Sequence, residues 1–309
     1  MRSENMILST STGDLIHESH SIAEAIKGIS QAGFRHFNIE FDHWINHAEL
    51  KQNISDIQSV LQETGSDAVL AHSACFTYDK SNLTEIIDET LFDIKACQML
   101  GIKDIVVHPL CHPSFGMREM YKFNKSFYTE LLDRSADTDI NLLIENFGDS
   151  EQHSSVFASG MDMREFIEYV DSPRIAGCWD TAHCNLCAAP RDDQYENIVA
   201  LGDKLRALHV SDNYGIGMHL HSFPLSGVID FDSVLYALKD INYKGAFNFE
   251  ASYTIRYHRT CPRARKSRPD YNGRPALLLD PSMELRIHAE KLLYECGRFL
   301  LTQHGLTVE

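Results

Sequence analysis

Eight short apolar runs, rich in β-branched and aromatic residues, alternate with longer amphipathic segments along nearly the whole chain. The segments between them, such as SIAEAIKGISQAG, place apolar residues at helical spacing and carry a glycine where a helix would end. Nearly continuous apolar strands separated by helices predict a parallel sheet that helices cover. The runs cover residues 6–10, 34–41, 67–75, 104–110, 140–147, 174–180, 205–212 and 246–252.

Eight such βα units predict an α/β fold of the (β/α)8 TIM-barrel class, with an open doubly wound sheet as the competing topology. The open sheet is less favoured because no G-x-G-x-x-G follows the first run and G-x-x-x-x-G-K-[ST] occurs nowhere. We expect a single TIM-barrel domain over residues 1–309, with a basic loop insertion at about 253–280 before a C-terminal helix.

The chain is acidic, because 28 Lys and Arg residues stand against 44 Asp and Glu residues and give a formal net charge of −16. Such a field repels phosphate backbones and anionic lipids, so we expect no membrane partner, and the charge disfavours nucleic acid as a partner. No run approaches the roughly 18 apolar residues that span a bilayer, and the first residues do not resemble a secretory signal. We expect a cytoplasmic protein, with homo-oligomerisation left open.

Polar residues end every apolar run from the second onward. In a barrel, the C-terminal strand ends meet at one mouth, so these residues would form a ring around one cavity. Each of them alone is equally consistent with a strand end that bonds to a loop, but several buried carboxylates side by side are costly without a cation. The seven residues are Glu40, His72, His108, Glu145, Asp180, His209 and Glu250.

Four of these residues form the tightest predicted metal-binding set: Glu145, Asp180, His209 and Glu250. Three carboxylates and one imidazole suit a divalent ion such as Mn²⁺, Zn²⁺, Co²⁺ or Mg²⁺. We expect at least one ion, with two or three left open. Further metal or substrate ligands could come from His72, His108, His183, His219 and His221, with solvated loop residues as the alternative for the last two.

The motifs as a set resemble the xylose-isomerase-like TIM-barrel superfamily of sugar isomerases, epimerases and apurinic-site endonucleases. The motifs are I-E-N (144–146), W-D-T-A-H (179–183), L-H-V-S-D-N (208–213), the loop at 221–231 and F-E-A (249–251), and the resemblance covers about residues 6–252. It implies metal ligands at Glu145, Asp180, His209 and Glu250, with both glutamates as the acid–base pair of an epimerase.

The endonuclease branch of that superfamily holds three zinc ions, and the resemblance implies that its further ligands would match His72, His108, His183, His219 and His221. One departure puts the third ion in doubt. Where that branch has Asp-x-His in the seventh loop, this chain has His219-Leu220-His221.

The expected activity is that of a divalent-metal-dependent isomerase or epimerase of a small sugar, sugar phosphate or polyol. Proton transfer would pass through a metal-stabilised enediolate, with Glu145 and Glu250 as bases on opposite faces of the carbon. His183 would hold a substrate hydroxyl, and Trp179 or Phe76 would pack against the sugar. Two alternatives remain: a related lyase, inosose-dehydratase-like or C-glycoside-cleaving, and an abasic-site endonuclease-like multi-metal phosphodiesterase, which the charge opposes.

A basic segment at residues 256–274 does not fit the βα repeat. It carries seven of the 28 basic residues and a single acidic residue, Asp270. It could form a lid or offer guanidinium groups to a phosphorylated or carboxylated substrate. The alternative is a solvated insertion or a contact with the acidic surface of another subunit.

Overall fold

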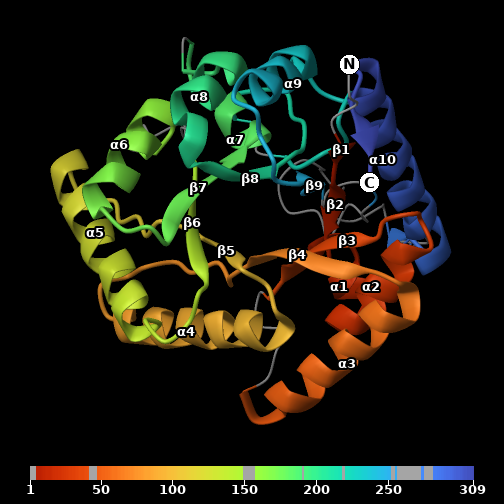
Figure 1. Ribbon diagram of the computed structural model, residues 1–309, viewed down its shortest axis with the longest axis horizontal. Coiled ribbons are helices and arrows are strands. Elements are labelled where there is room, and N and C mark those ends of the chain that lie inside the picture. Colours follow the sequence, from red (N-terminus) through yellow and green to blue (C-terminus); the bar gives the residue numbers. More distant parts are fainter. Residues whose placement is uncertain are drawn as a thin grey trace.

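The computed structural model describes residues 5–41, 47–148, 157–189, 191–217, 220–251, 255, 273–274 and 281–309, apart from the side chains of residues 17 and 18. Within this part of the chain, strands alternate with helices around a central barrel (Figure 1). The barrel strands are β2 (Leu8–Ser11), β3 (His36–Glu40), β4 (Asp67–His72), β5 (Asp104–Val107), β6 (Asn141–Glu145), β7 (Ile175–Asp180), β8 (Leu205–His209) and β9 (Phe247–Phe249).

The helices lie on the outside of the barrel and follow the strands in chain order (Figure 1). They are α1 (Gly13–Ser19), α2 (Ile22–Ser30), α3 (Leu50–Thr64), α4 (Leu83–Leu100), α5 (Met117–Arg134), α6 (Gly160–Val170), α7 (Thr181–Asn185), α8 (Gln194–Leu201), α9 (Phe231–Asp240) and α10 (Met283–Gln303). Short 3₁₀ turns cover His47–Glu49 and Gly202–Lys204, and a small parallel pair joins β1 (Asn5–Met6) to β10 (Thr307–Val308).

All eight barrel strands are parallel, and their order is β8-β7-β6-β5-β4-β3-β2-β9. A parallel bridge between Val210 and Phe249 brings the two end strands together, so the sheet curls into a nearly closed barrel. The fold is therefore a (β/α)8 TIM barrel, which confirms the predicted fold class and excludes the open sheet. Seven of the predicted runs contain a barrel strand completely, and the first, 6–10, overlaps β2 except for Ser11. The pairing of β1 with β10 was not anticipated.

The barrel interior has an apolar layer below the strand ends. Alternate residues of a strand point to opposite faces, so one set packs against the helices and the other fills the barrel. An inward cluster comes from five consecutive strands, β4 to β8. Ser9, Asn38 and Asn248 occupy the corresponding buried positions on β2, β3 and β9, and the Ser9 hydroxyl donates to Asn248 Oδ1 at 2.8 Å. The five apolar residues are Leu70, Val106, Leu143, Cys178 and Ala207.

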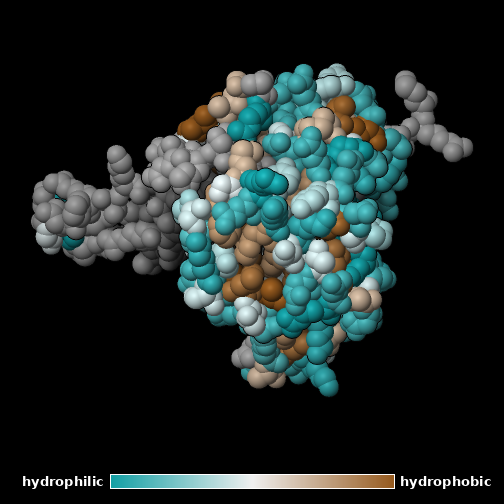
Figure 2. Space-filling model, turned by 90° about the vertical axis from the view of Figure 1, so that its left-hand side faces the viewer, coloured by the Kyte–Doolittle hydropathy of each residue, from teal (hydrophilic) through white to brown (hydrophobic). Residues whose placement is uncertain are grey.

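The outer surface is mostly hydrophilic on the side where α5 and α6 lie, with a hydrophobic area near its middle (Figure 2). None of the helices in the described residues is both long and apolar enough for a membrane crossing. The prediction of one domain over residues 1–309 stays a prediction. The predicted basic insertion lies outside the described residues, apart from Ile255, Gly273 and the exposed Arg274.

Candidate active site

The four predicted metal ligands meet at the C-terminal mouth of the barrel, although they come from four different strand ends. Each of Glu145, Asp180, His209 and Glu250 offers one ligand atom, and these atoms all lie within 4.8 Å of one another. The first three side chains are fully buried, whereas 21% of the Glu250 side chain is exposed. The group is therefore shielded from solvent except at Glu250.

His209 lies between the two glutamates. Its Nδ1 atom is 3.1 Å from Glu145 Oε1 and 2.8 Å from Glu250 Oε2. Both carboxylates therefore point at one imidazole nitrogen, which is the arrangement expected of groups that share a cation.

Asp180 provides the strongest sign that this site needs a cation. Its Oδ1 atom accepts the backbone N–H of His183 at 2.6 Å and caps the first turn of α7. Its Oδ2 atom is buried and has no hydrogen-bond partner among the residues that the structure describes. An unpaired buried carboxylate oxygen is costly, and a divalent ion would remove that cost. The residues present therefore fit a metal.

A second group of candidate ligands lies beside the first and shares Glu145 with it. His108 Nε2 is 2.8 Å from Glu145 Oε2, and His72 Nε2 is 3.1 Å from His108 Nε2 and 3.4 Å from Glu145 Oε2. Cys75 Sγ lies 3.4 Å from His108 Nδ1. Glu40 borders this group, with its Oε1 atom 3.4 Å from His72 Nδ1. The structure thus brings all seven strand-end residues to one mouth, as the sequence predicts.

His183 and His221 form a third group with Asp180. The Nδ1 atom of His183 donates to the Asn146 carbonyl at 2.9 Å and lies 3.3 Å from Glu145 Oε1.

His221 Nδ1 is 3.8 Å from Asp180 Oδ2 and 3.8 Å from Glu250 Oε2. The interpretation of His221 as a solvated loop residue is wrong, because it is buried against the site. His219 lies outside the described residues, so its pairing with His221 stays a prediction.

Burial and the neighbouring charges shift the pKa values of the site carboxylates in opposite directions. Burial by itself would raise the pKa of Glu145, but His209 and His108 hold that pKa well below its usual range. Burial raises the pKa of Asp180 despite the nearby His183. Burial would also raise the pKa of Glu250, yet His209 and His221 lower it. Both glutamates are therefore carboxylates at neutral pH.

We predict that the metal-free protein becomes less stable as the pH rises. Burial opposes the charged forms of His72 and His183. Glu40 and Glu145 nevertheless raise the pKa of His72 from 6.5 to about 9. Asp180 and Glu145 raise the pKa of His183 from 6.5 to about 10. The stability that the two protonated histidines give the folded state is complete below about pH 6.5 and is lost as the pH passes about 9. The Tm in a chelator should fall by about 5 °C between these values. A Tm that is unchanged or higher at the alkaline end would contradict this, and His72→Gln should flatten the dependence.

Asn146 and Phe147 hold and line the site. The Asn146 amide donates to the Asp180 carbonyl at 3.0 Å and accepts the Asp180 backbone N–H at 2.6 Å, which ties the end of β6 to the end of β7. The ring of Phe147 lies 4.9 Å from that of His108 and stacks at 5.5 Å on His183. The sequence signal for Phe147 is its place two residues beyond Glu145, at the end of the same apolar run.

The expectation that Trp179 packs against a sugar is wrong. Trp179 is fully buried in the core between sheet and helices, where its indole N–H donates to Gln194 Oε1 at 3.1 Å. Since Asp180 points into the barrel, its neighbour in the strand must point out. Phe76 is partly buried against the same core. Cys75, three residues beyond the end of β4, is exposed and contacts His108.

The loop that carries His221 is organised by Asp212. The carboxylate of Asp212 accepts the backbone N–H groups of Asn213 at 2.9 Å, Gly227 at 2.8 Å and Ile229 at 3.1 Å. Gly227 approaches so closely that an added Cβ would lie 2.2 Å from the Asn213 carbonyl oxygen. The L-H-V-S-D-N motif therefore contains a candidate ligand, His209, and the carboxylate that shapes the loop beside it.

We predict that Gly227→Ala lowers kcat/KM about tenfold, because the displaced loop would move His221 away from Asp180. Steady-state kinetics together with amide exchange over residues 213–229 measures this. Gly116→Ala is the matched control, since nothing lies within 4 Å of the Cβ it would add. Equal activity and equal exchange protection in the two variants would show that the close approach is unimportant.

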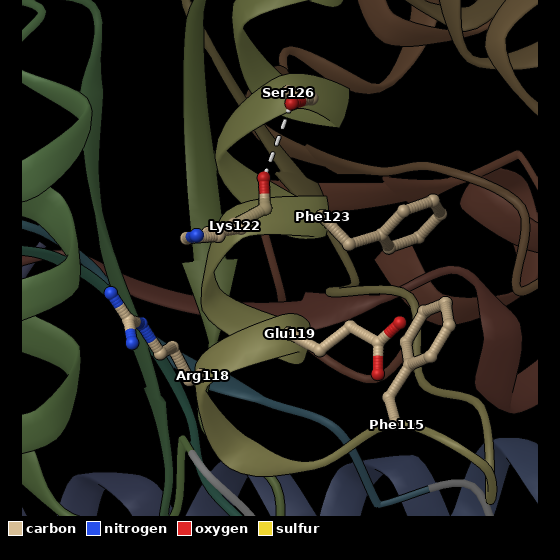
Figure 3. Close-up of a pocket in the computed structure, with 6 residues that line it drawn as sticks. All are labelled: Phe115, Arg118, Glu119, Lys122, Phe123 and Ser126. Atoms are coloured by element: carbon tan, nitrogen blue, oxygen red, sulfur yellow. Dashed lines mark hydrogen bonds between the residues drawn. The ribbon is translucent and has the colours of Figure 1, made fainter.

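A separate pocket lies on the outer surface of α5 (Figure 3). The side chains of Phe115 and Phe123 point to one side of the helix and Arg118 to the other (Figure 3). None of the strand-end residues lines it, so it is distinct from the site at the mouth. Its lining residues are Phe115, Arg118, Glu119, Lys122, Phe123 and Ser126.

Comparison with known proteins agrees with this geometry. A family model described as the xylose isomerase-like TIM barrel matches residues 26–269. An L-ribulose 3-epimerase from Methylomonas sp. (strain DH-1) is 23% identical over 235 residues, which cover 74% of this chain and 77% of the relative. A probable endonuclease 4 from Staphylococcus carnosus is 26% identical over 200 residues, which cover 60% and 66% of the two chains.

Among solved structures, a D-psicose 3-epimerase in the presence of D-fructose superposes with a TM-score of 0.71 at 18% identity, and the match covers 96% of this chain and 99% of the other. This likeness shows a shared fold.

Proposed function

The chain belongs to the xylose isomerase-like TIM barrel family, and from that premise we propose that it is a divalent-metal-dependent isomerase or epimerase of a small sugar, sugar phosphate or polyol. The observation that carries the proposal is the convergence of Glu145, Asp180, His209 and Glu250 around Asp180 Oδ2, a buried atom with no hydrogen-bond partner in the described part of the chain. The similarity to a sugar 3-epimerase supports an enzyme acting on sugars.

These four residues would hold the ion, and Mn²⁺, Co²⁺, Zn²⁺ and Mg²⁺ all accept such ligands. A bound divalent ion supplies Lewis acidity, which draws electron density from a substrate carbonyl and makes the neighbouring C–H more acidic. Three carboxylates at this place would repel one another without a cation, so the site is expected to bind one ion tightly. The neighbouring groups around His72 and around His183 offer candidate ligands for a second and a third ion.

Glu145 and Glu250 are proposed to move the proton. Both stay deprotonated at neutral pH, because His209 lies between them and lowers both pKa values against the effect of burial. One carboxylate takes the proton from the carbon beside the carbonyl, and the other returns a proton to the opposite face. An epimerase returns it to the same carbon and an isomerase to the neighbouring one.

His183 and Phe147 are proposed to position the substrate. Since the Nδ1 atom of His183 is engaged by Asn146, its ring is oriented by the strand end and can hold a sugar hydroxyl. Phe147 stacks on that ring and contacts His108, so it can cover an apolar face of the sugar. Phe147 takes the role first expected of Trp179.

A multi-metal phosphodiesterase is the second candidate function. The groups His72–Glu145–His209 and Asp180–His183–His221 favour it, because they would allow further ions beside the first. A probable endonuclease 4 is also among the relatives. The net charge of −16 opposes binding to a polyanion. A lyase that shares the proton-abstraction step remains the other alternative.

The deciding experiment measures proton exchange in D₂O. Free ketoses, ketose phosphates and inososes are incubated with the metal-loaded protein, and each recovered sugar is analysed by mass spectrometry and NMR. The proposal expects one deuterium at a carbon next to the carbonyl, with a new epimer or isomer. Exchange without any new stereoisomer but with loss of water would indicate the lyase. Cleavage of abasic duplex DNA with no exchange in any sugar would contradict the proposal.

A further inference from the structure

The last helix, α10, turns three large apolar side chains away from the barrel. Leu285, Leu292 and Phe299 are exposed to 47%, 57% and 53%. They lie seven residues apart, so they form one stripe along the helix. Figure 1 shows α10 at the outer edge of the barrel. Such a stripe in contact with water is unfavourable and typical of a surface that another helix covers.

The opposite face of α10 is fixed against the barrel, which determines where the stripe points. Leu293, Gly297 and Leu301 are buried. At Gly297 the helix comes so near the sheet that an added Cβ would lie 2.7 Å from Leu8 Cδ1 and 2.8 Å from the Phe249 ring. The helix therefore cannot turn its apolar stripe inward.

The stripe is symmetric about its central residue. Leu285 and Phe299 lie seven residues before and seven residues after Leu292. If a second copy of α10 packs antiparallel with Leu292 on a two-fold axis, Leu292 meets itself and Leu285 meets Phe299 at both ends. A spacing of seven is also the period of helices that pack side by side at a small angle. The surface is thus complementary to itself, which is what a two-fold interface requires.

The charges beside the stripe fit the same pairing. In that register Glu284 of one helix lies near Arg298 of the other, and Lys291 lies near Glu295 and also near its own copy. Both pairs join opposite charges, and each occurs twice because of the symmetry. The half-exposed Arg298 and Glu295 side chains already pair with each other within one helix at 3.3 Å, so the dimer would extend this pair into a network that includes Glu284 and Lys291. In an acidic protein, a face whose charges pair with those of its own copy favours a second copy over an unrelated acidic partner.

We infer that α10 forms the interface of a homodimer, in which two copies pack antiparallel about a two-fold axis at Leu292. The stripe alone is smaller than the roughly 800 Å² per partner of a standard interface. The neighbouring α9 extends it, since Tyr236 is 55% exposed and its ring contacts His304, next to the end of α10, at 4.8 Å. The four proposed metal ligands come from one chain, so the dimer does not depend on the proposed function.

Sedimentation analysis of Leu292→Asp tests the interface. The wild-type protein is expected to sediment at twice the mass of the single chain. The variant places two aspartates face to face on the axis and should raise the dimer dissociation constant at least about 100-fold. Met161→Asp, which alters a comparably exposed residue on α6, should leave the dimer intact. A wild-type protein that is monomeric at about 100 µM, or a Leu292→Asp variant that dimerises equally well, would overturn the inference.

Cross-linking tests the position of the axis. Under mild oxidation Leu292→Cys should link to its own copy, beyond any linkage of the native thiols seen in wild type. Leu285→Cys alone should not, because its copy would lie about 21 Å away along the helix, whereas a mixture of Leu285→Cys and Phe299→Cys should link the two variants. A dimer in which Leu292→Cys stays unlinked uses a different face, which would also overturn the inference.

Discussion

Glu250→Gln should lower turnover by at least about 1000-fold while the protein remains folded. Glutamine keeps the shape of the side chain but cannot accept a proton from carbon, and it removes one of three negative charges from the proposed metal site. Glu250 is partly exposed and lies at the end of the barrel rather than in its core, so the barrel should tolerate the change. Steady-state kinetics on the substrate found by deuterium exchange, with circular dichroism, measures both effects.

Glu130→Gln on α5 is the matched control, because its side chain is half exposed. Glu130 lies near the C-terminal end of α5, which leads to the start of β6, at the end of the barrel away from the mouth. The Glu130→Gln variant should retain full activity. More than about a tenth of wild-type activity in Glu250→Gln would be incompatible with a role as base or ligand.

Asp180→Asn should abolish tight metal binding and leave the fold in place. The asparagine oxygen can still accept the His183 backbone N–H and cap α7. The negative charge shared by Oδ2, which accepts no hydrogen bond from the described residues, is lost. Affinity for Mn²⁺ should fall at least about 100-fold. Calorimetric titration of the chelator-treated protein measures this, and the rise in Tm that Mn²⁺ gives the wild type should disappear.

Asp193→Asn is the control for the helix cap. Asp193 accepts the Glu196 backbone N–H at 2.9 Å at the start of α8, as Asp180 does at the start of α7. It should bind Mn²⁺ as the wild type does. If both variants bind the ion equally well, Asp180 acts only as a cap and the proposed ligand set is wrong.

Much of the barrel could be predicted because its strands are buried on both faces and therefore appear as continuous apolar runs. The polar residues that interrupt these runs, such as Glu145 and His209, mark the strand ends. Since the C-terminal ends of all the parallel strands of a barrel meet at one mouth, the convergence of these residues followed from topology alone. The pairing of β1 with β10 involves two residues from each strand, which is too short to leave a periodic signal.

The surroundings of the site were less accessible to sequence reasoning. Trp179 could have been excluded by strand alternation, because it precedes the inward Asp180. Phe147 and Cys75 follow strand ends, where the path of the loop decides what a side chain contacts, and no period in the sequence reports that path. The sharing of Glu145 between His209 and His108 depends on distances across the barrel that residue spacing does not contain.

The most direct measurement is the anomalous diffraction of a crystal soaked in Mn²⁺. We predict a peak at the barrel mouth about 2.2 Å from oxygen atoms of Glu145, Asp180 and Glu250 and from a nitrogen of His209. Additional peaks beside His72 and His108 would show a polynuclear site around the first ion. An empty mouth at saturating Mn²⁺ and at saturating Zn²⁺, or ions bound only elsewhere on the protein, would contradict the proposed metal centre and the chemistry inferred from it.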